Sequence, residues 1–384
     1  MRLPLLSVAC CGLLVACATP APPPDVAGLF QDAHFAPPAK AIDVSDVFAV
    51  SDAMRHFLRV EIAGELRREG RTHGLVDALL RRDGLHLEYD AALTRNAAEA
   101  FSERKGNCLS LVIMTAALAK ELGLGVHYQQ VDIDTSWSRT GDLAFRSTHV
   151  NVDLGRRILD PWSGYDPSSN LTIDFVPASD IWGVRTRELP ERTIVAMYLN
   201  NRAAENLARG AVDEAYWWAR EAIRQAADYT SAYNTLAVVY LRHGDYAPAE
   251  RVLRALVARD AGDVTALSNL AIVLEREHRD AESAQLRARL AKLEPLPPFH
   301  YFLQGMAALK RGDDELARAL FQKEVDRADA CGECHFWLAL ADLRVGRTAE
   351  ARAQLEAAAD NSTSGAEAQL YATKLAHLRS IGMP

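Results

Sequence analysis

The spacing of apolar residues changes its period along the chain. From about residue 44 to residue 84 apolar side chains recur at helical intervals, as in Met54, Phe57, Leu58 and Ile62. Next, a helix-like segment at 91–104 and an apolar helix at 109–122 precede two runs of alternating apolar and polar residues at 126–131 and 149–154, which predict strands. Helix followed by sheet within one segment indicates an α+β unit.

Beyond Glu191 the chain is rich in Ala, Leu, Arg and Glu and has a period of 34 residues. Turn glycines follow this step, with His278 in place of one of them, at Gly210, Gly244, Gly312 and Gly346. Small residues form two more columns, Ala203, Ala237, Ala271, Gly305 and Ala339, and Ala215, Ala249, Ser283, Ala317 and Ala351. This pattern resembles the tetratricopeptide repeat (TPR), in which small residues let paired helices approach closely. It predicts an all-α solenoid of five repeats over 193–360 and a capping helix over 361–384. The resemblance implies a concave face that binds a protein or peptide.

The first residues form a separate apolar segment. Arg2 is the single charge before an apolar stretch from Leu3 to Ala16, which is too short for a permanent membrane span and suits an export signal over residues 1–16. The run ends in Leu14-Val15-Ala16-Cys17, which resembles the bacterial lipobox and implies a lipid on Cys17. A signal peptide cut elsewhere and an uncleaved anchor are the alternatives.

The residues after Cys17 predict the location of the anchor and its connection to the fold. Ala18, by resemblance to bacterial sorting rules, indicates the periplasmic side of the outer membrane, with the inner membrane and surface exposure left open. Four prolines at positions 20, 22, 23 and 24 disfavour helix and sheet. The sequence therefore predicts a stiff tether over residues 17–43.

Composition narrows the class of partner. The 384 residues are 49% hydrophobic and 24% charged, which is typical of a folded protein with two or three domains. The formal net charge is −8, and no cluster of Lys or Arg is interleaved with aromatic residues. We therefore expect no nucleic-acid partner, because a phosphate backbone would be repelled.

The six cysteines fall into three groups. Cys10 and Cys11 belong to the expected signal and Cys17 to the lipid anchor, which leaves Cys108, Cys331 and Cys334. The close pair in Cys331-Gly332-Glu333-Cys334-His335 can form a disulfide, carry haem, bind metal or remain as thiols. We expect the disulfide, because the motif lies within the 34-residue step and has no obvious axial ligand, and we expect no cofactor and no metal. Cys108 is then the single free thiol.

The segment around Cys108 has the features of a nucleophile site. Gly106 permits a tight turn, Asn107 can cap the apolar helix, and a thiol on the first helical turn is stabilised as thiolate. A base is expected at His149. If the chain turns at Gly155, the hairpin register sets Asp160 opposite His149, within reach of a hydrogen bond.

The order Gly-Asn-Cys at a helix start, Thr148-His149 on a strand and Leu-Asp-Pro-Trp after it resembles the transglutaminase-like superfamily, whose fold is papain-like. Two segments upstream of this motif resemble the sequence that commonly precedes the Cys in that family: Leu87-Glu88-Tyr89-Asp90 and Thr94-Arg95-Asn96-Ala97. The resemblance covers residues 85–164, about a fifth of the chain. It implies an α+β domain over 44–190, with Cys108 as nucleophile, His149 as general base and acid, and Asp160 as orienting carboxylate. The reaction class is acyl transfer at an amide through a thioester.

Two functions follow from the sequence. In the first, a membrane-anchored cysteine hydrolase, peptidase or acyltransferase acts on amide bonds while its repeats recruit a protein partner. In the second, the transglutaminase-like domain is a non-catalytic binding module and the repeats form an assembly scaffold.

Overall fold

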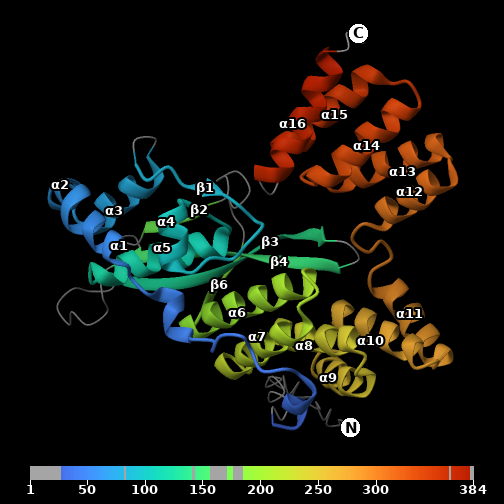
Figure 1. Ribbon diagram of the computed structural model, residues 1–384, viewed down its shortest axis with the longest axis horizontal. Coiled ribbons are helices and arrows are strands. Elements are labelled where there is room, and N and C mark those ends of the chain that lie inside the picture. The colour runs from blue at the N-terminus through green and yellow to red at the C-terminus, as the bar shows by residue number, and fades with distance from the viewer. Residues whose placement is uncertain are drawn as a thin grey trace, which may run out of the picture.

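The computed structural model describes residues 27–81, 84–140, 143–155, 171–175, 185–362 and 365–380 (Figure 1). An α/β part is followed by an arm of paired helices. The expected signal peptide, Cys17 and the first part of the expected tether lie outside the described residues. Within these ranges, no helix combines the length and the apolar character that crossing a bilayer requires.

The α/β part begins with short helical segments and continues into two central helices and two sheets. Its helical elements are η1 (Ala27–Leu29), η2 (Asp32–His34), η3 (Val44–Phe48), α1 (Asp52–His56), the π-helical turn η4 (Phe57–Glu61), α2 (Ala63–Arg68), α3 (Arg71–Leu80), α4 (Ala97–Glu103) and α5 (Cys108–Glu121). Its strands are β1 (Glu88–Tyr89), β2 (Lys105–Gly106), β3 (Gly125–Thr140), β4 (Leu143–Gly155), β5 (Leu171–Ile173) and β6 (Thr186–Leu189).

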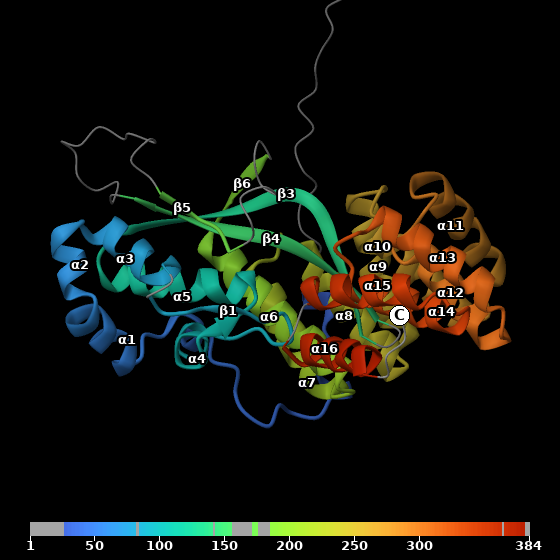
Figure 2. The same ribbon diagram turned by 90° about the horizontal axis from the view of Figure 1, so that it is seen from above.

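The larger sheet has the order β5-β4-β3-β6 and is antiparallel throughout. Strand β4 pairs with β3 in a register that sets His149 opposite Val131. Both faces of the second half of β4 are buried: Val150 and Val152 lie on one face, and His149 and Asn151 on the other. Figure 2 shows this sheet lying over α5, whose residues 108–119 are all buried. Helix α5 is therefore the central core element of the α/β part.

The helical arm consists of five helix pairs and a final helix. They are α6 (Glu191–Ala208), α7 (Val212–Gln225), α8 (Thr230–His243), α9 (Tyr246–Arg259), α10 (Val264–Arg276), α11 (Asp280–Leu293), α12 (His300–Arg311), α13 (Asp314–Arg327), α14 (Gly332–Arg344), α15 (Thr348–Asp360) and α16 (Gly365–Ser380). The predicted small residues lie at helix contacts. A Cβ on Gly305 would approach the ring of Phe321 to 2.7 Å, which explains the glycine there. His278 has a φ of 59°, the left-handed conformation that glycine adopts at the equivalent turns. The arm is thus a TPR-type array.

The first helix of the array also belongs to the core of the α/β part. Ile194, Met197 and Leu199 of α6 are buried in one continuous cluster with residues of α5 and β4. The same cluster extends through α10 to Leu274. The boundary predicted between residues 190 and 193 therefore separates the two patterns of sequence, but the α/β part and the first repeats share one hydrophobic core.

The five helix pairs do not form one run, because the array divides between α11 and α12. Residues of α12–α14 form a second core cluster, and α15 and α16 belong to a third. At the regular junctions a turn closes through one backbone bond, in which Tyr229, Asp263 or Cys331 donates its N–H to the carbonyl three residues earlier. Pro297 occupies the equivalent position between α11 and α12 and has no N–H to donate.

Side chains at the same junction are polar where the other repeats are apolar. Gln304 of α12 is exposed, whereas Leu270 and Leu338, at the same repeat position, are buried. Leu286 of α11 is only partly buried, whereas the equivalent Val252 of α9 is fully buried. Because terminal repeats need a polar outer face, α11 and α12 have the character of two solenoid ends.

Residues 29–39, here called the N-terminal strap, are packed against helices α7, α8 and α9. The ring of Phe35 is 5% exposed and stacks on Tyr216 with centroids 4.0 Å apart. Tyr240 donates to the carbonyl of Leu29 at 2.7 Å, and Trp217 donates to the carbonyl of Ala36 at 2.6 Å. A tether was expected over 17–43, but this part of it is docked, because its apolar and backbone groups find partners on the first two repeats.

Candidate active site

Cys108 is the first residue of α5, and the preceding Asn107 caps the helix. The side-chain oxygen of Asn107, Oδ1, accepts from the backbone N–H of Ser110 at 2.9 Å and from the Ser110 hydroxyl at 2.8 Å. Gly106 was expected to permit a tight turn. Its role is instead close packing, because a Cβ there would lie 2.6 Å from the Cβ of Ser110.

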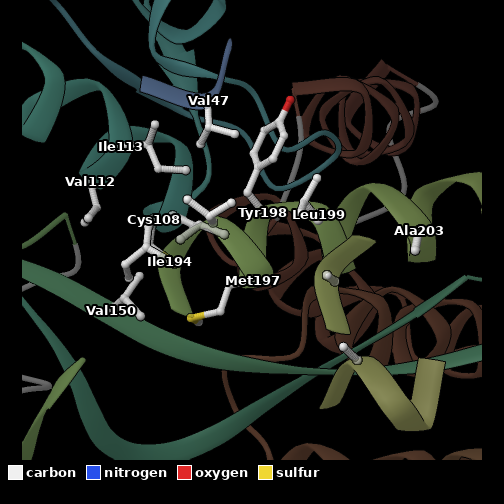
Figure 3. Packing of buried hydrophobic residues seen from close by; sticks show 14 of the residues in the cluster. Val47, Cys108, Val112, Ile113, Val150, Ile194, Met197, Tyr198, Leu199 and Ala203 are labelled. Carbon is white, nitrogen blue, oxygen red and sulfur yellow. The ribbon is translucent and has the colours of Figure 1, made fainter. Parts of the chain in front are cut away.

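The thiol of Cys108 is enclosed by apolar side chains. It is 7% exposed and belongs to the main core cluster. Figure 3 shows Cys108 close to Ile194 of α6, with Val150 of β4 and Val47 of η3 among the surrounding residues. Segments far apart in the sequence therefore pack together around Cys108.

The structure brings Cys108 and His149 together. The two side chains lie close enough for Cys108 to affect the pKa of His149. On its other side, the Nε2 atom of His149 lies 2.7 Å from a carboxylate oxygen of Asp174. Because Nε2 faces Asp174, the remaining ring nitrogen, Nδ1, is the one available to the sulfur. His149 is 6% exposed, so this chain of three groups is shielded from water.

Asp174 is the residue that the sequence analysis missed. Its carboxylate also accepts from the side-chain amide of Asn151 at 3.2 Å. Strand β5 pairs with β4 so that Ile173 is opposite Val152, and one further step of this register sets Asp174 opposite Asn151. The run Leu171-Thr172-Ile173 alternates apolar and polar residues before Asp174, which was the available signal for a strand ending in a carboxylate.

The turn predicted at Gly155 is wrong, because Leu154 and Gly155 continue strand β4 and pair with Val126 and Gly125 of β3. Asp160 itself lies outside the described residues. The pairing expected between Asp160 and His149 therefore stays a prediction. Among the described residues, β4 has β3 and β5 as its neighbours.

The neighbours of His149 favour its protonated form. Burial by itself lowers the pKa of His149, but the hydrogen bond to Asp174 and then the interaction with the nearby Cys108 outweigh it and raise the pKa to about 9. An imidazolium beside a sulfur stabilises the thiolate, which is the nucleophilic form. The arrangement can therefore supply a nucleophile, a proton donor and an orienting carboxylate.

A buried ion pair supports the loop before Cys108. Arg95, which is 5% exposed, donates to Asp90 at 3.0 Å and to Glu103 at 2.8 Å. Its backbone N–H donates to the hydroxyl of Ser110 at 2.8 Å. Tyr89 pairs with Gly106 across the short parallel sheet of β1 and β2. These contacts fix the chain on both sides of the Asn107 cap.

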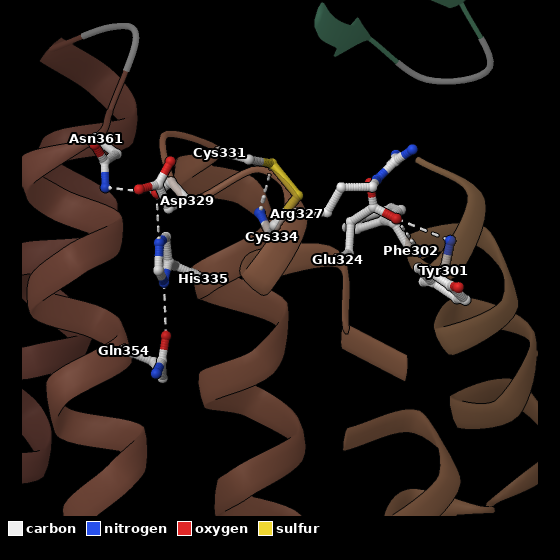
Figure 4. The surroundings of a disulfide bond; sticks show 10 residues. All are labelled: Tyr301, Phe302, Glu324, Arg327, Asp329, Cys331, Cys334, His335, Gln354 and Asn361. Atoms are coloured by element: carbon white, nitrogen blue, oxygen red, sulfur yellow. Dashed lines mark hydrogen bonds and ion pairs between the residues drawn. A yellow bond between two sulfur atoms is a disulfide. The ribbon is translucent and has the colours of Figure 1, made fainter. Parts of the chain in front are cut away.

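Cys331 and Cys334 form a disulfide at the start of α14 (Figure 4). Both ring nitrogens of the adjacent His335 have partners, the side chain of Gln354 at 2.6 Å and the carbonyl of Asp329 at 2.7 Å. The disulfide is the first of the four alternatives that the sequence left open. Among the described residues, no group of three or more His, Cys, Asp or Glu side chains is arranged to hold a metal ion.

Comparisons with known proteins give no family assignment. No protein-family model and no curated protein matches the chain. Solved structures with some likeness include a thermophilic TPR protein of Thermus thermophilus, at 21% identity and a TM-score of 0.31 over 47% of this chain and 98% of that one. Another is pilF of Pseudomonas aeruginosa, at 19% identity and a TM-score of 0.30 over 50% of this chain and 87% of that one. A third is YrrB, described as a TPR protein with an unusual peptide-binding site, at 17% identity and a TM-score of 0.25 over 47% of this chain and 92% of that one. At these scores the TPR assignment rests on the helix pairs of the chain itself.

Proposed function

We propose that the chain is a cysteine-dependent acyl-transfer enzyme of the transglutaminase-like kind, whose repeats recruit a protein or peptide partner. The observation that carries this proposal is the connected set Cys108, His149 and Asp174, with a 2.7 Å bond between the last two. A thiol, an imidazole and a carboxylate in this order are the groups that thioester chemistry needs.

In the proposed reaction the thiolate of Cys108 attacks the carbonyl carbon of an amide. His149, as imidazolium, gives its proton to the departing amine, and the acyl group remains on sulfur as a thioester. His149, now neutral, takes a proton from water or from a second amine, which attacks the thioester and restores the thiolate. Asp174 holds the ring in place and stabilises its positive charge.

The start of α5 also supports stabilisation of the oxyanion. The first N–H groups of a helix have no partner within the helix, and the Asn107 side chain satisfies only that of Ser110. The N–H of Cys108 is thereby available to an oxygen held at the sulfur.

The repeats supply polar groups suited to a peptide backbone. The first helices of repeats 1 to 3 carry Asn200, Asn201, Asn234 and Asn269, and the last two are joined by a 2.8 Å side-chain bond. Side-chain amides offer both a donor and an acceptor, which matches the alternating groups of an extended peptide. We propose that the partner binds along these helices.

We also propose that Cys17 carries a lipid that anchors the protein to the outer membrane on its periplasmic side. Incorporation of labelled fatty acid should be lost in Cys17→Ala and kept in Cys11→Ala, a matched change within the expected signal. Label retained in Cys17→Ala would reject the anchor.

The nucleophile is tested by alkylation of the intact protein with iodoacetamide, followed by mass spectrometry of the peptide containing Cys108. Because the pKa of the adjacent His149 is raised to about 9, its imidazolium should be present between pH 6 and 8, and we expect the rate to reach a plateau in this range. His149→Ala should slow alkylation at pH 7 by about tenfold or more, since each pKa unit changes the thiolate fraction tenfold. A rate that rises tenfold per pH unit in the wild type, unaltered by His149→Ala, would reject the enzyme.

A second candidate is a non-catalytic scaffold, favoured by the 7% exposure of Cys108. A buried thiol is reached only if the surrounding side chains move. If Cys108 resists alkylation in the folded protein while Cys108→Ser leaves partner binding intact, the scaffold is the better account.

A further inference from the structure

Thr94 lies between the start of α5 and the first helix of the repeats. It is 1% exposed, and its hydroxyl oxygen accepts from the Asn107 amide at 2.9 Å and from the Asn201 amide at 3.2 Å. One donor belongs to the cap of the Cys108 helix and the other to α6. A single buried oxygen thus joins the two elements.

The backbone of Thr94 is also held by α6. Its N–H donates to a carboxylate oxygen of Glu205 at 2.6 Å, and its carbonyl accepts from Arg202 at 3.2 Å. Arg202 and Glu205 form an ion pair at 3.4 Å, and the guanidinium of Arg202 lies over the ring of Trp218, 5.6 Å from its centroid. Three side chains of the first repeat therefore fix both the backbone and the hydroxyl of this loop residue.

Asn107 uses both the oxygen and the nitrogen of its side-chain amide, so the loss of either partner affects the other bond. Its oxygen caps the N–H of Ser110, while its nitrogen donates to Thr94. Without the Thr94 hydroxyl, the amide nitrogen loses its partner in a partly buried setting, and only the bonds to Ser110 then hold Asn107 in its capping rotamer. The first turn of α5 then frays more easily, and it is this turn that holds the sulfur against His149.

We propose that Thr94 is a positioning residue through which helix α6 of the repeats holds Cys108 in its reactive geometry. This inference rests on the proposed function, because it assigns a support to the same nucleophile. It makes the first repeat a structural part of the active site and not only a recruiting surface.

The test compares Thr94→Val with Thr94→Ser in the full chain. Valine keeps the shape and removes the hydroxyl, whereas serine keeps the hydroxyl. The measurements are the pH profile of Cys108 alkylation by iodoacetamide and the thermal unfolding midpoint. Thr94→Val should slow alkylation at pH 7 by roughly five- to tenfold, the effect of one buried hydrogen bond, and shift the plateau to higher pH. Thr94→Ser should stay within about twofold of the wild type.

A substitution in helix α6 tests the same contact without altering the loop that contains Thr94. Asn201→Ala should move the profile in the same direction by a smaller factor, whereas Gln304→Ala, which removes an exposed amide on α12, should leave it unchanged. If Thr94→Val lowers the unfolding midpoint but keeps the wild-type pH profile, the role is merely structural and the inference is overturned. If Thr94→Val does not fold, the pH profile of Asn201→Ala alone tests the inference, and an unaltered profile overturns it.

The same data separate this inference from the function on which it rests. A wild-type plateau that disappears in His149→Ala, but keeps its rate and its pH range in both Thr94→Val and Asn201→Ala, rejects the positioning role alone. The absence of any plateau in the wild type rejects both.

Discussion

His149 and Asp174 are bonded at 2.7 Å although 25 residues separate them in the chain. The bond exists because β5 pairs with β4 and its register carries the carboxylate beside the imidazole. Asp174 is itself held by Asn151, so the carboxylate has a fixed orientation.

We expect Asp174→Asn to remove the negative charge that stabilises the imidazolium form of His149. The pKa of His149 should fall, so that alkylation of Cys108 at pH 7 slows by about tenfold or more, in line with one pKa unit. Asp160→Asn is the matched control, because the sequence predicted that residue for the same role. If Asp160→Asn has the larger effect and Asp174→Asn none, the orienting carboxylate is Asp160.

The pH dependence of stability follows from the raised pKa of His149. A group whose pKa is about 9 in the folded protein and 6.5 when free stabilises the fold in full below pH 6.5, and this contribution is lost as the pH rises through 9. The free energy of unfolding, measured with urea, should therefore differ between wild type and His149→Gln by more at pH 6 than at pH 10. An equal difference at both values would show that the imidazolium does not contribute.

Truncation tests the shared core of α5 and α6. A chain ending at residue 190 loses Ile194, Met197 and Leu199, and the apolar side chains around Cys108 become exposed. We expect this fragment to be insoluble or to lack cooperative unfolding, whereas a chain ending at residue 294 should unfold cooperatively. A folded, soluble fragment that ends at residue 190 would contradict the shared core.

The N-terminal strap should contribute measurably to stability. Phe35 is buried against Tyr216, and a buried Phe→Ala change costs about 3–5 kcal/mol. Leu316→Ala is the control, because Leu316 is 41% exposed and surface changes stay within about 0.5 kcal/mol. Denaturant unfolding of both variants checks this. A loss in Phe35→Ala no larger than in the control would mean that the strap is not docked in solution.

The division between α11 and α12 predicts two unfolding units. Because no core cluster of the described residues spans this junction, calorimetry of the full chain should resolve two transitions. A fragment from residue 295 to 384 should retain helical circular dichroism and one of these transitions. A single transition in the full chain, with an unfolded fragment, would indicate that the five repeats are coupled.

The local features of the site were predictable from short segments. The Asn107 cap and the position of Cys108 at the helix start depend on neighbours within three residues. The alternation at 149–154 gives the strand that carries His149. Pro297 was also visible in the sequence, but its consequence follows only when the backbone bond of the regular turns is known.

By itself the sequence determined the helices of the array, the strands around His127 and His149, the 34-residue period and the presence of a free thiol and of a candidate base. These depend on side-chain periodicity, capping and cysteine spacing within contiguous residues. Tertiary structure decided that Asp174 bonds to His149 and that α6 belongs to the core of the α/β part as well as to the helical arm. It also decided that residues 29–39 dock on the repeats and that Thr94 joins α5 to α6. Each of these is a contact between segments distant in the chain. Such contacts are set by strand register and by the burial of apolar surface, which no local pattern specifies.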